Sequence, residues 1–348
     1  MTTTAADQLT SDTDERIGTT ALLPKLLKRP EFGSIVGAIA IFIFFSAATE
    51  NFFSIQAISA YANPAATLGI MAVAVALLMI GGEFDLSAGA MIGFIGMMTA
   101  LLINNGGLAV WLSMLITLAL AVCIGAFNGL VVTRTRLPSF IVTLGTFFIV
   151  QGLGLGLARA VGGTTTIFLS ERFEGQGFFK AIFASTQWEG VRIPVFYWIA
   201  IAVVATRLLL RTKVGNWIFS VGGDPNAANA VGVPVVRVKI ALFINVSAMA
   251  WLVAMFNTFR FESAQIGTGV GSEFEFIIAA VIGGCLLTGG YGSAIGAAIG
   301  ALMFEMVRQG LAFARWEADW FKLFLGILLL LAALLNQLVR SRAEKART

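Results

Sequence analysis

Two acidic residues and a serine lie where one long apolar run ends and the next begins, and they are the first side chains that could do chemistry. They are Glu83, Asp85 and Ser87, in the stretch from Gly81 to Gly89. A charge at the edge of a hydrophobic span is costly to bury and usually has a function, such as lining a path for a polar solute. Asp85 or Ser87 is also suited to capping the next helix, and the spacing favours the cap.

Further polar residues lie inside or beside other apolar runs. Thr143 and Thr146 follow Leu137-Pro138, a helix boundary, and hydrogen bonding between helices is a more common role for them than ligand contact. Gln265 lies in a glycine-rich segment together with Thr268 and could shape a substrate mouth. The candidates for a translocation path are Asp85, Ser87, Asn128, Thr143, Thr146 and Gln265.

Glu305 and Arg308 form a second charged group, three residues apart on one predicted helix. They can pair with each other, which lowers the cost of burying either, or lie near the outer membrane interface. For a transporter driven by an ion gradient, Glu305 is the one plausible coupling carboxylate inside a span.

Enzyme signatures are missing from the sequence. Histidine is absent, so the commonest general base and metal ligand is not available. No Gly-Lys dipeptide exists, which excludes a phosphate-binding loop ending in Gly-Lys-Ser/Thr. Gly152, Gly154 and Gly156 lie inside an apolar run without the spacing of a dinucleotide turn. We therefore expect no catalytic, cofactor-binding or metal-ligating residue, and any ATPase must be another chain.

The elements that position these residues are predicted to be membrane helices. Hydrophobic residues make up 58% of the 348 and charged residues 12%, with a mean hydropathy of +0.88. Soluble domains are about one quarter charged. Runs of about 20 apolar residues predict an all-α protein with about ten transmembrane helices. The predicted spans are 34–49, 62–80, 86–104, 108–132, 139–160, 193–211, 238–258, 274–290, 293–311 and 321–338, the eighth and ninth with uncertain boundaries or a partly re-entrant path.

Basic residues set the predicted orientation. With the N-terminus inside, the inner segments hold 15 of the 23 lysines and arginines, which favours two cytoplasmic termini. They are Arg16, Lys25, Lys28, Arg29, Arg134, Arg136, Arg207, Arg211, Lys213, Arg237, Lys239, Arg340, Arg342, Lys345 and Arg347. The net charge of +4 reflects these loops rather than a nucleic-acid partner. The predicted organisation is a cytoplasmic tail at 1–33, a transmembrane domain at 34–338 with an outer loop at 161–192 and an inner loop at 212–237, and a cytoplasmic tail at 339–348.

The inner loop contains start and stop signals for a short helix. Asp224 suits the N-cap, Pro225 the first helical position and Gly232 the position after the last turn. An ordered loop without a partner has no need of such signals, so we expect a helix that docks a cytoplasmic partner. The residues of this coupling segment are Gly223, Asp224, Pro225, Asn226, Ala227, Ala228 and Gly232.

Two glycine patterns concern helix packing. Gly292, Gly296 and Gly300 are spaced four apart and predict a small-residue stripe on one helix face. The segments 72–91 and 279–298 also resemble each other, each with an apolar run, a glycine pair and a second run, with Gly81-Gly82 matched to Gly289-Gly290. A parallel internal repeat and a chance similarity are equally compatible with that pattern.

Several motifs in the same order resemble the permease subunit of ribose-type ABC importers for simple sugars, which are relatives of branched-chain amino-acid permeases. The resemblance covers about residues 35 to 338. It is carried by Gly81-Gly82-x-x-Asp85-Leu86-Ser87-x-Gly89, Asn128-Gly129, Pro138-x-Phe140-Ile-Val-Thr143-Leu144-Gly145-Thr146, Gly222-Gly223-Asp224-Pro225-x-Ala227-Ala228, Ala279-Ala280-Val-Ile-Gly283-Gly284 and Gly289-Gly290-x-Gly292-Ser293.

The resemblance implies a location in the bacterial inner membrane, a second permease copy in a homodimer or a related heterodimer, two cytoplasmic ATPase domains and a periplasmic sugar-binding protein. ATP would be hydrolysed by the partner. Two departures stand out: the family usually has Glu before Ala-Ala and Arg after it, where this chain has Asn226 and Asn229, and Glu83 is an extra acid. The alternatives are an ion-coupled secondary transporter, a same-fold importer of amino acids or a signalling sugar, and a non-transporting scaffold.

Overall fold

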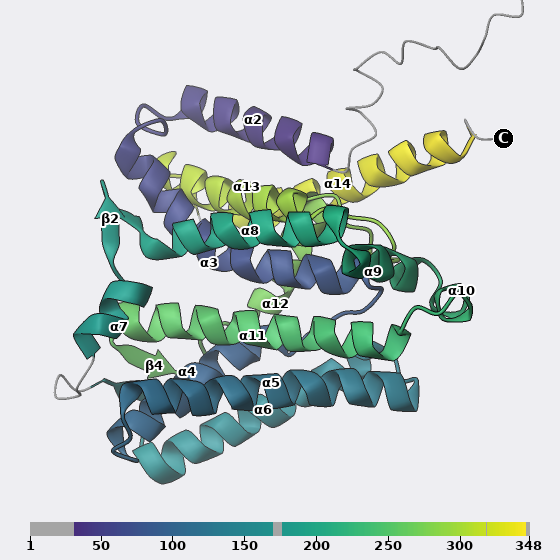
Figure 1. Cartoon of the computed structure of the whole chain (residues 1–348). Helices are drawn as coiled ribbons and strands as arrows, with labels where there is room; N and C mark the ends of the chain where they lie inside the picture. Colours follow the sequence, from purple (N-terminus) through teal and green to yellow (C-terminus); the bar gives the residue numbers. More distant parts are fainter. Residues whose placement is uncertain (1–30, 170–175, 318, 346–348) are drawn as a thin grey trace, which may run out of the picture.

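The computed structural model describes residues 31–169, 176–317 and 319–345, and these fold into a bundle of membrane-type helices (Figure 1). Seven of the described helices are long and apolar enough to cross a membrane. The multi-pass all-α prediction is therefore confirmed. The helices are α2 (Glu31–Ala48), α3 (Ile55–Ile80), α4 (Ala88–Asn104), α5 (Val110–Thr135), α6 (Ser139–Gly162), α7 (Gln176–Phe183), α8 (Ile193–Arg211), α9 (Lys213–Gly223), α10 (Pro225–Ala230), α11 (Val235–Phe261), α12 (Ser272–Ile282), α13 (Ala294–Phe313) and α14 (Trp320–Lys345).

Within the described ranges, four short strands accompany the helices. β1 (Thr166–Phe168) pairs antiparallel with β4 (Ser263–Gln265), and β2 (Thr186–Trp188) pairs with β3 (Val191–Arg192). Figure 1 places α7, β2 and β4 at one end of the bundle and α9 and α10 at the other. The second end also carries Arg134 and Arg136 at the end of α5 and Arg211 at the end of α8, and we call it the basic end.

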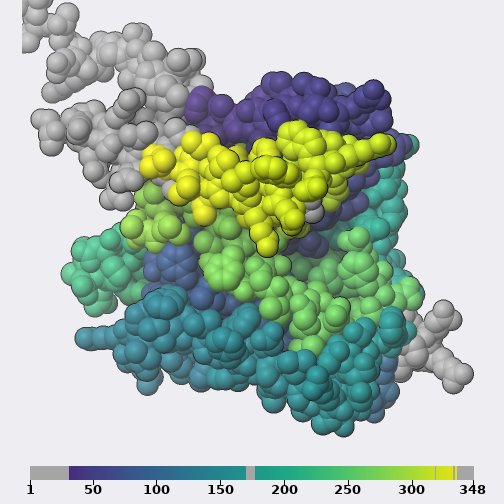
Figure 2. Space-filling model, turned by 180° about the vertical axis from the view of Figure 1, so that it is seen from behind, coloured from purple at the N-terminus to yellow at the C-terminus, as the bar shows by residue number. Residues whose placement is uncertain are grey.

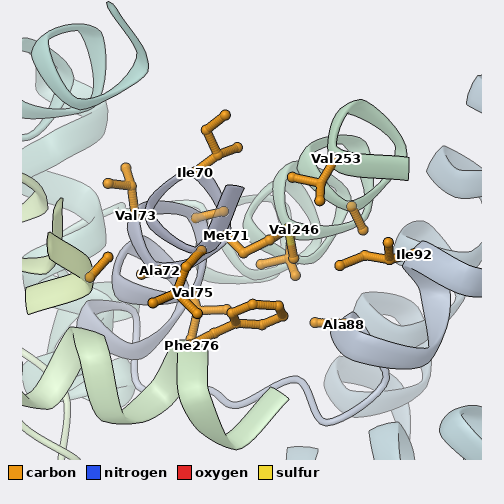
Figure 3. Close-up of a cluster of buried hydrophobic side chains, with 14 of the residues drawn as sticks. Ile70, Met71, Ala72, Val73, Val75, Ala88, Ile92, Val246, Val253 and Phe276 are labelled. Carbon is orange, nitrogen blue, oxygen red and sulfur yellow. The ribbon is translucent and has the colours of Figure 1, made fainter. Parts of the chain in front are cut away.

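The centre of the bundle is α3, whose residues from Ile70 to Ile80 are almost completely buried. Figure 3 shows Met71 and Val75 of α3 near Val246 of α11, Ile92 of α4 and Phe276 of α12. Seen from behind, α2 (purple) and α14 (yellow) form one edge of the molecule and the teal helices the other (Figure 2). A helix that is apolar all round and buried all round must sit among other helices, so α3 is the core against which the polar turns are held.

Several helices differ in their bounds from the predicted spans; α3, for example, begins at Ile55 rather than at residue 62. The eighth predicted span, 274–290, is wrong in length, because α12 ends at Ile282. Gly283 is its C-cap and Gly284 has a φ of 97°, a left-handed conformation that glycine adopts without strain. At the C-terminus, α14 continues to Lys345, beyond the predicted end of the last span at 338, and the cytoplasmic tail from 339 stays a prediction. Of the N-terminal tail predicted at 1–33, residues 1–30 lie outside the described residues, and α2 already begins at Glu31.

The glycine stripe is partly confirmed. A Cβ on Gly296 would lie 1.9 Å from the Gly283 carbonyl oxygen, and one on Gly300 would lie 2.1 Å from the Ala279 carbonyl oxygen. These two glycines of α13 therefore allow close packing on α12. Gly292 is not on that helix face, because it precedes the Ser293 N-cap.

The predicted internal repeat stays a prediction, but the ends of α3 and α12 share one local structure, in a different register from the predicted one. After α3, the amides of Gly82 and Glu83 donate to the carbonyl oxygens of Met79 (2.9 Å) and Leu78 (3.1 Å). After α12, the amides at 284 and 285 donate in the same pattern to the carbonyls at 281 and 280. Both are Schellman caps with a glycine in the left-handed region. The equivalent glycine pairs are thus 81–82 and 283–284, rather than 289–290.

Candidate functional site

Four of the candidate path residues form one buried chain of hydrogen bonds at the turn between α3 and α4. Asn128 Nδ2 of α5 donates to Ser87 Oγ (3.1 Å), and Ser87 Oγ donates to Asp85 Oδ1 (2.5 Å). Thr146 Oγ1 of α6 donates to Asn128 Oδ1 (2.6 Å). All four residues are at most 4% exposed. The turn is therefore attached through side chains to two neighbouring helices.

Two hydroxyl groups of α6 hold the backbone of the same turn. The Phe84 amide donates to Ser139 Oγ, and the Leu86 amide donates to Thr143 Oγ1, both at 3.0 Å. Thr143 was a predicted path residue and belongs to this cluster. Ser139 was missed, although its place directly after Pro138 at the start of α6 marks it as the residue nearest the helix boundary.

Asp85 has a local role in this cluster. Its Oδ1 atom accepts from the Ser87 amide at 2.8 Å, which is the geometry of a side chain that orders the start of α4. Its Oδ2 atom is buried and has no hydrogen-bond partner among the described residues. The N-cap of α4 is Ser87, whose side chain makes no capping hydrogen bond, so Asp85 orders the turn before the helix rather than capping it. That the cluster lines a translocation path stays a prediction.

Replacing Asp85 with alanine is expected to lower the thermal midpoint of the purified chain in detergent. The Ser87 amide and hydroxyl would both lose their acceptor, and an unsatisfied buried polar group costs about 1–3 kcal/mol. Asp85→Asn is the matched control, because its amide oxygen can keep both bonds while the unpartnered position becomes an NH₂ group. Equal midpoints for Asp85→Ala and Asp85→Asn would show that the cluster does not hold the turn.

Glu83, the extra acid of the same turn, is paired. Its carboxylate Oε1 forms a salt bridge with the ammonium Nζ of Lys239 on the first turns of α11. The side chains are 9% and 16% exposed. Sequence reasoning noticed Glu83 but not its partner, because the two are 156 residues apart and no local pattern joins them.

The predicted short helix in the inner loop is confirmed as α10. Asp224 Oδ1 accepts from the amides of Asn226 (2.8 Å) and Ala227 (3.1 Å). Pro225 occupies the first helical position, and Gly232 has a φ of 87° after the last turn. The helix is therefore held by the start and stop residues expected from sequence.

The outward surface of α10 is small and nearly neutral. Ala228 is buried and anchors the helix, whereas Asn226 and Ala227 are exposed. Val231, directly after the helix, is 81% exposed. Figure 1 shows α10 projecting from the basic end of the bundle. An exposed apolar side chain beside a capped, small-residue helix is a surface that a partner groove can cover.

Glycines attach α9 and α10 to the two repeated turns. A Cβ on Gly222 would lie 1.7 Å from the Ile80 carbonyl oxygen and 2.7 Å from the Gly290 amide nitrogen. The Gly290 amide donates to that Ile80 oxygen at 2.9 Å. A Cβ on Gly289 would lie 2.8 Å from Gly82 Cα. We call this backbone contact of Gly82, Gly222, Gly289 and Gly290 the glycine junction.

The charged pair on α13 is also confirmed. Arg308 donates to Glu305 Oε1 (2.8 Å) and to Glu275 Oε1 of α12 (2.6 Å). The guanidinium carbon lies 4.9 Å from the ring centroids of Phe304 and Phe321. Glu305 is 1% exposed. The cluster therefore connects α12, α13 and α14, and Glu305 is an ion-pair partner of Arg308 in it.

Glu305 is not the one buried acid of the described residues, but it lies inside α13 whereas the others lie in a turn or at a helix start, so its role as the one candidate coupling carboxylate inside a span stays a prediction. Glu83, Asp85 and Glu273 are each at most 7% exposed. Gln265 lies apart from all of them, in β4 at the end opposite α10, and it is exposed. The six candidate path residues thus separate into a buried cluster of five and one distant residue.

Comparison with known proteins places these features in a family. The model of the branched-chain amino acid transport system / permease component family matches residues 57–333. No solved structure matches the chain significantly.

Three relatives are similar along nearly their whole length. The xylose/arabinose import permease protein XylH of Sulfolobus acidocaldarius is 31% identical over 93% of this chain and 89% of that protein. The xylose transport system permease protein XylH of Escherichia coli is 27% identical over 92% and 94%. The autoinducer 2 import system permease protein LsrC of Photorhabdus laumondii is 26% identical over 93% and 94%.

The matched segment contains α10, the glycine junction and both repeated turns. The chain belongs to the branched-chain amino acid transport system / permease component family and is a membrane-spanning permease of the ABC importer type.

Proposed function

We propose that this chain carries an uncharged monosaccharide or related polyol across the bacterial inner membrane by alternating access. The relatives named for xylose, arabinose and autoinducer 2 support that substrate class. The chain would work with a second permease copy, two cytoplasmic ATPase domains and a periplasmic sugar-binding protein. It would bind no cofactor itself, and its ATPase partner would hydrolyse ATP.

The observation that carries the proposal is the capped helix α10 at the basic end. Basic segments of membrane proteins face the cytoplasm, so α10 would face the ATPase. Its exposed residues are Asn226 and Ala227, with Val231 beside them, and Ala228 anchors the helix inward. The coupling contact would therefore depend on shape and apolar area rather than on paired charges. Gly232, whose φ is 87°, would let the chain turn sharply after α10, and Gly223 is the last residue of α9 on the other side.

A displacement of α10 would be transmitted to the membrane helices through the glycine junction. Gly222 of α9 touches the backbone at the end of α3 and at Gly290, between α12 and α13. Rigid backbone contacts transmit displacement better than long side chains, because little side-chain freedom can absorb it. We infer that ATPase closure tilts the helices that flank the two repeated turns and thereby opens the path inward. The buried cluster around Asp85 would keep the first turn intact during that movement.

Replacing Ala227 with glutamate is expected to abolish ATP-dependent sugar uptake in cells while leaving the thermal midpoint of the purified permease unchanged. Ala227 is exposed, so the chain itself loses no packing, but a charge would enter a neutral docking surface. Gln187→Glu, an exposed position at the opposite end, is the matched control and should transport normally. Normal uptake by Ala227→Glu would disprove the coupling role of α10. Uptake by the purified permease without any ATPase would instead favour ion-coupled transport.

A further inference from the structure

The segment between β4 and α12 runs through the bundle without forming a helix. Residues 264–269 pass along α4, where two glycines allow the two backbones to touch. A Cβ on Gly93 would lie 2.3 Å from the Ile266 carbonyl oxygen, and one on Gly89 would lie 2.4 Å from the Gly269 carbonyl oxygen. Because Gly89 is in the first turn of α4, the segment reaches from the β4 end deep toward the basic end.

Non-helical backbone at membrane depth is stable only where protein buries it or where it lines a water-filled cavity. One face of this segment is buried on α4. Its other face borders a cavity of about 360 Å³ between α4, α11 and the segment itself. That volume falls within the range of small-molecule sites. The cavity is lined by Ile92, Gly93, Gly96, Ala254, Asn257, Thr258, Phe261, Ser263, Ala264, Gln265 and Thr268.

Thr258 gives the clearest sign that the cavity is built for a polar occupant. It is 2% exposed, and its hydroxyl has no hydrogen-bond partner in the described part of the chain. The hydroxyls of Thr99 and Thr117, which are similarly buried in helices, donate to the carbonyl oxygen four residues earlier, at 2.8 and 2.9 Å. Thr258 Oγ1 is not among the fully buried unpartnered atoms of the described residues, so this hydroxyl is open to the cavity, where water or a ligand can form its hydrogen bonds.

The other polar side chains of the lining are also free to form hydrogen bonds with a bound solute. Within the described ranges, no side-chain hydrogen bond involves Asn257, Ser263, Gln265 or Thr268. Together with Thr258 they present hydroxyl and amide groups, which can both donate and accept. Phe261 adds an apolar surface. This combination matches a solute that carries many hydroxyl groups on a carbon skeleton.

Among the described residues, no charged side chain lines the cavity. Glu262, next to the lining in sequence, forms a salt bridge with Lys180 (2.8 Å), and Arg260 stacks on the Phe261 ring (4.7 Å from guanidinium carbon to centroid) without itself lining the cavity. A charged solute would therefore lose its hydration without gaining a counter-ion. The lining favours uncharged polyols over amino acids.

We propose that this cavity is the site at which the permease itself holds an uncharged, polyhydroxylated solute, with Thr258, Asn257 and Gln265 as its hydrogen-bonding groups. The proposal rests on the proposed function and adds the place and chemistry of substrate contact. The solute would enter from the β4 end, where the binding protein would release it.

Thiol labelling tests the site on the full chain in lipid nanodiscs. Thr258→Cys is made in a Cys123→Ala background, because Cys123 is exposed whereas Cys285 is buried. The probe is a membrane-impermeant methanethiosulfonate, and the protecting solutes are D-xylose, D-ribose, D-glucose and ribitol, with L-leucine and L-glutamate for comparison. Thr99→Cys on α4 is the matched control, because Thr99 is completely buried and its hydroxyl is already bonded.

Thr258→Cys is expected to react at least about 10-fold faster than Thr99→Cys, since thiol reactivity requires access. At least one of the neutral solutes should slow the reaction several-fold, and the two amino acids should not. Should Thr258→Cys not fold, Gln265→Cys tests the same protection at an exposed position. Equal reactivity of the Thr258 and Thr99 variants, or equal protection by amino acids, would overturn the proposal.

The two proposals fail in different ways. ATP-dependent sugar uptake by the complete importer without protection of either cysteine would support the proposed function and disprove this site. Protection by a neutral polyol, in a system that shows no ATP-dependent uptake of any of these solutes, would support the site and contradict the proposed function.

Discussion

Replacing Gly222 with alanine is expected to prevent the chain from reaching its folded state. The added Cβ would lie 1.7 Å from the Ile80 carbonyl oxygen and 2.7 Å from the Gly290 amide nitrogen. Overpacking a core with side-chain atoms costs about 1–3 kcal/mol, and here both neighbours are backbone atoms that cannot rotate away, so we expect a loss above that range. The measurement is the yield of monodisperse protein on size exclusion, with the thermal midpoint of any folded fraction.

Gly223→Ala is the matched control for folding. It is the next residue of α9, and no heavy atom lies within 4 Å of its added Cβ. Because alanine is favoured over glycine in a helix by about 0.5–1 kcal/mol, this variant should fold with equal or higher stability. If Gly222→Ala is as stable as Gly223→Ala, the glycine junction is not a close backbone contact, and the coupling route through it must be abandoned.

Removing either partner of the Glu83–Lys239 pair is expected to destabilise the permease severely. The pair is largely buried, and a single substitution leaves the other charge without compensation, which typically costs about 3–5 kcal/mol. We therefore expect Glu83→Met and Lys239→Met each to lower the thermal midpoint in detergent strongly and to reduce expression.

The double variant Glu83→Met with Lys239→Met distinguishes the loss of the whole ion pair from the loss of one partner, which leaves the other charge unpaired. Replacing a buried ion pair by apolar residues of similar size is often neutral or stabilising, so stability should return to near the wild-type value. Additive losses would show that the two side chains do not depend on each other. A double variant that folds normally but no longer supports ATP-dependent uptake would show that the pair acts in the transport cycle.

Gly222, Glu83 and Lys239 all lie at the basic end, where the turn after α3, the turn after α12 and the helices α9 and α10 meet. Glu83 lies in the turn after α3, and Lys239 lies near the start of α11, soon after α10. Gly222 lies just before α10 on its other side. The coupling helix is thus connected on both sides to the turn after α3, by a backbone contact before it and by an ion pair after it.

The features that the sequence predicted correctly depend on a few neighbouring residues. Runs of about 20 apolar residues predicted the long helices, since a membrane helix satisfies its own backbone and needs only an apolar surface. Asp224, Pro225 and Gly232 predicted α10 with its boundaries, because caps act within one turn. The early end of α12 also had a local signal, the Gly283-Gly284 pair, but the apolar residues around it outweighed that signal in the prediction.

The contacts between distant segments were decided only by the tertiary structure. The sequence placed Asp85, Asn128 and Thr146 in one candidate path, but only the packing of α4, α5 and α6 shows that they share hydrogen bonds. It placed Gln265 in the same set, and the fold puts it at the opposite end.

The same long-range packing brings Glu83 into a salt bridge with Lys239 and Gly222 into close backbone contact with Ile80. The physical reason is that helix formation and capping are determined within a turn or two of the chain, whereas an ion pair, a backbone contact or a cavity requires several helices to be in place at once. The sequence by itself therefore determined a multi-span membrane protein with a capped inner helix. The tertiary structure determined what that helix touches and where a neutral solute could be held.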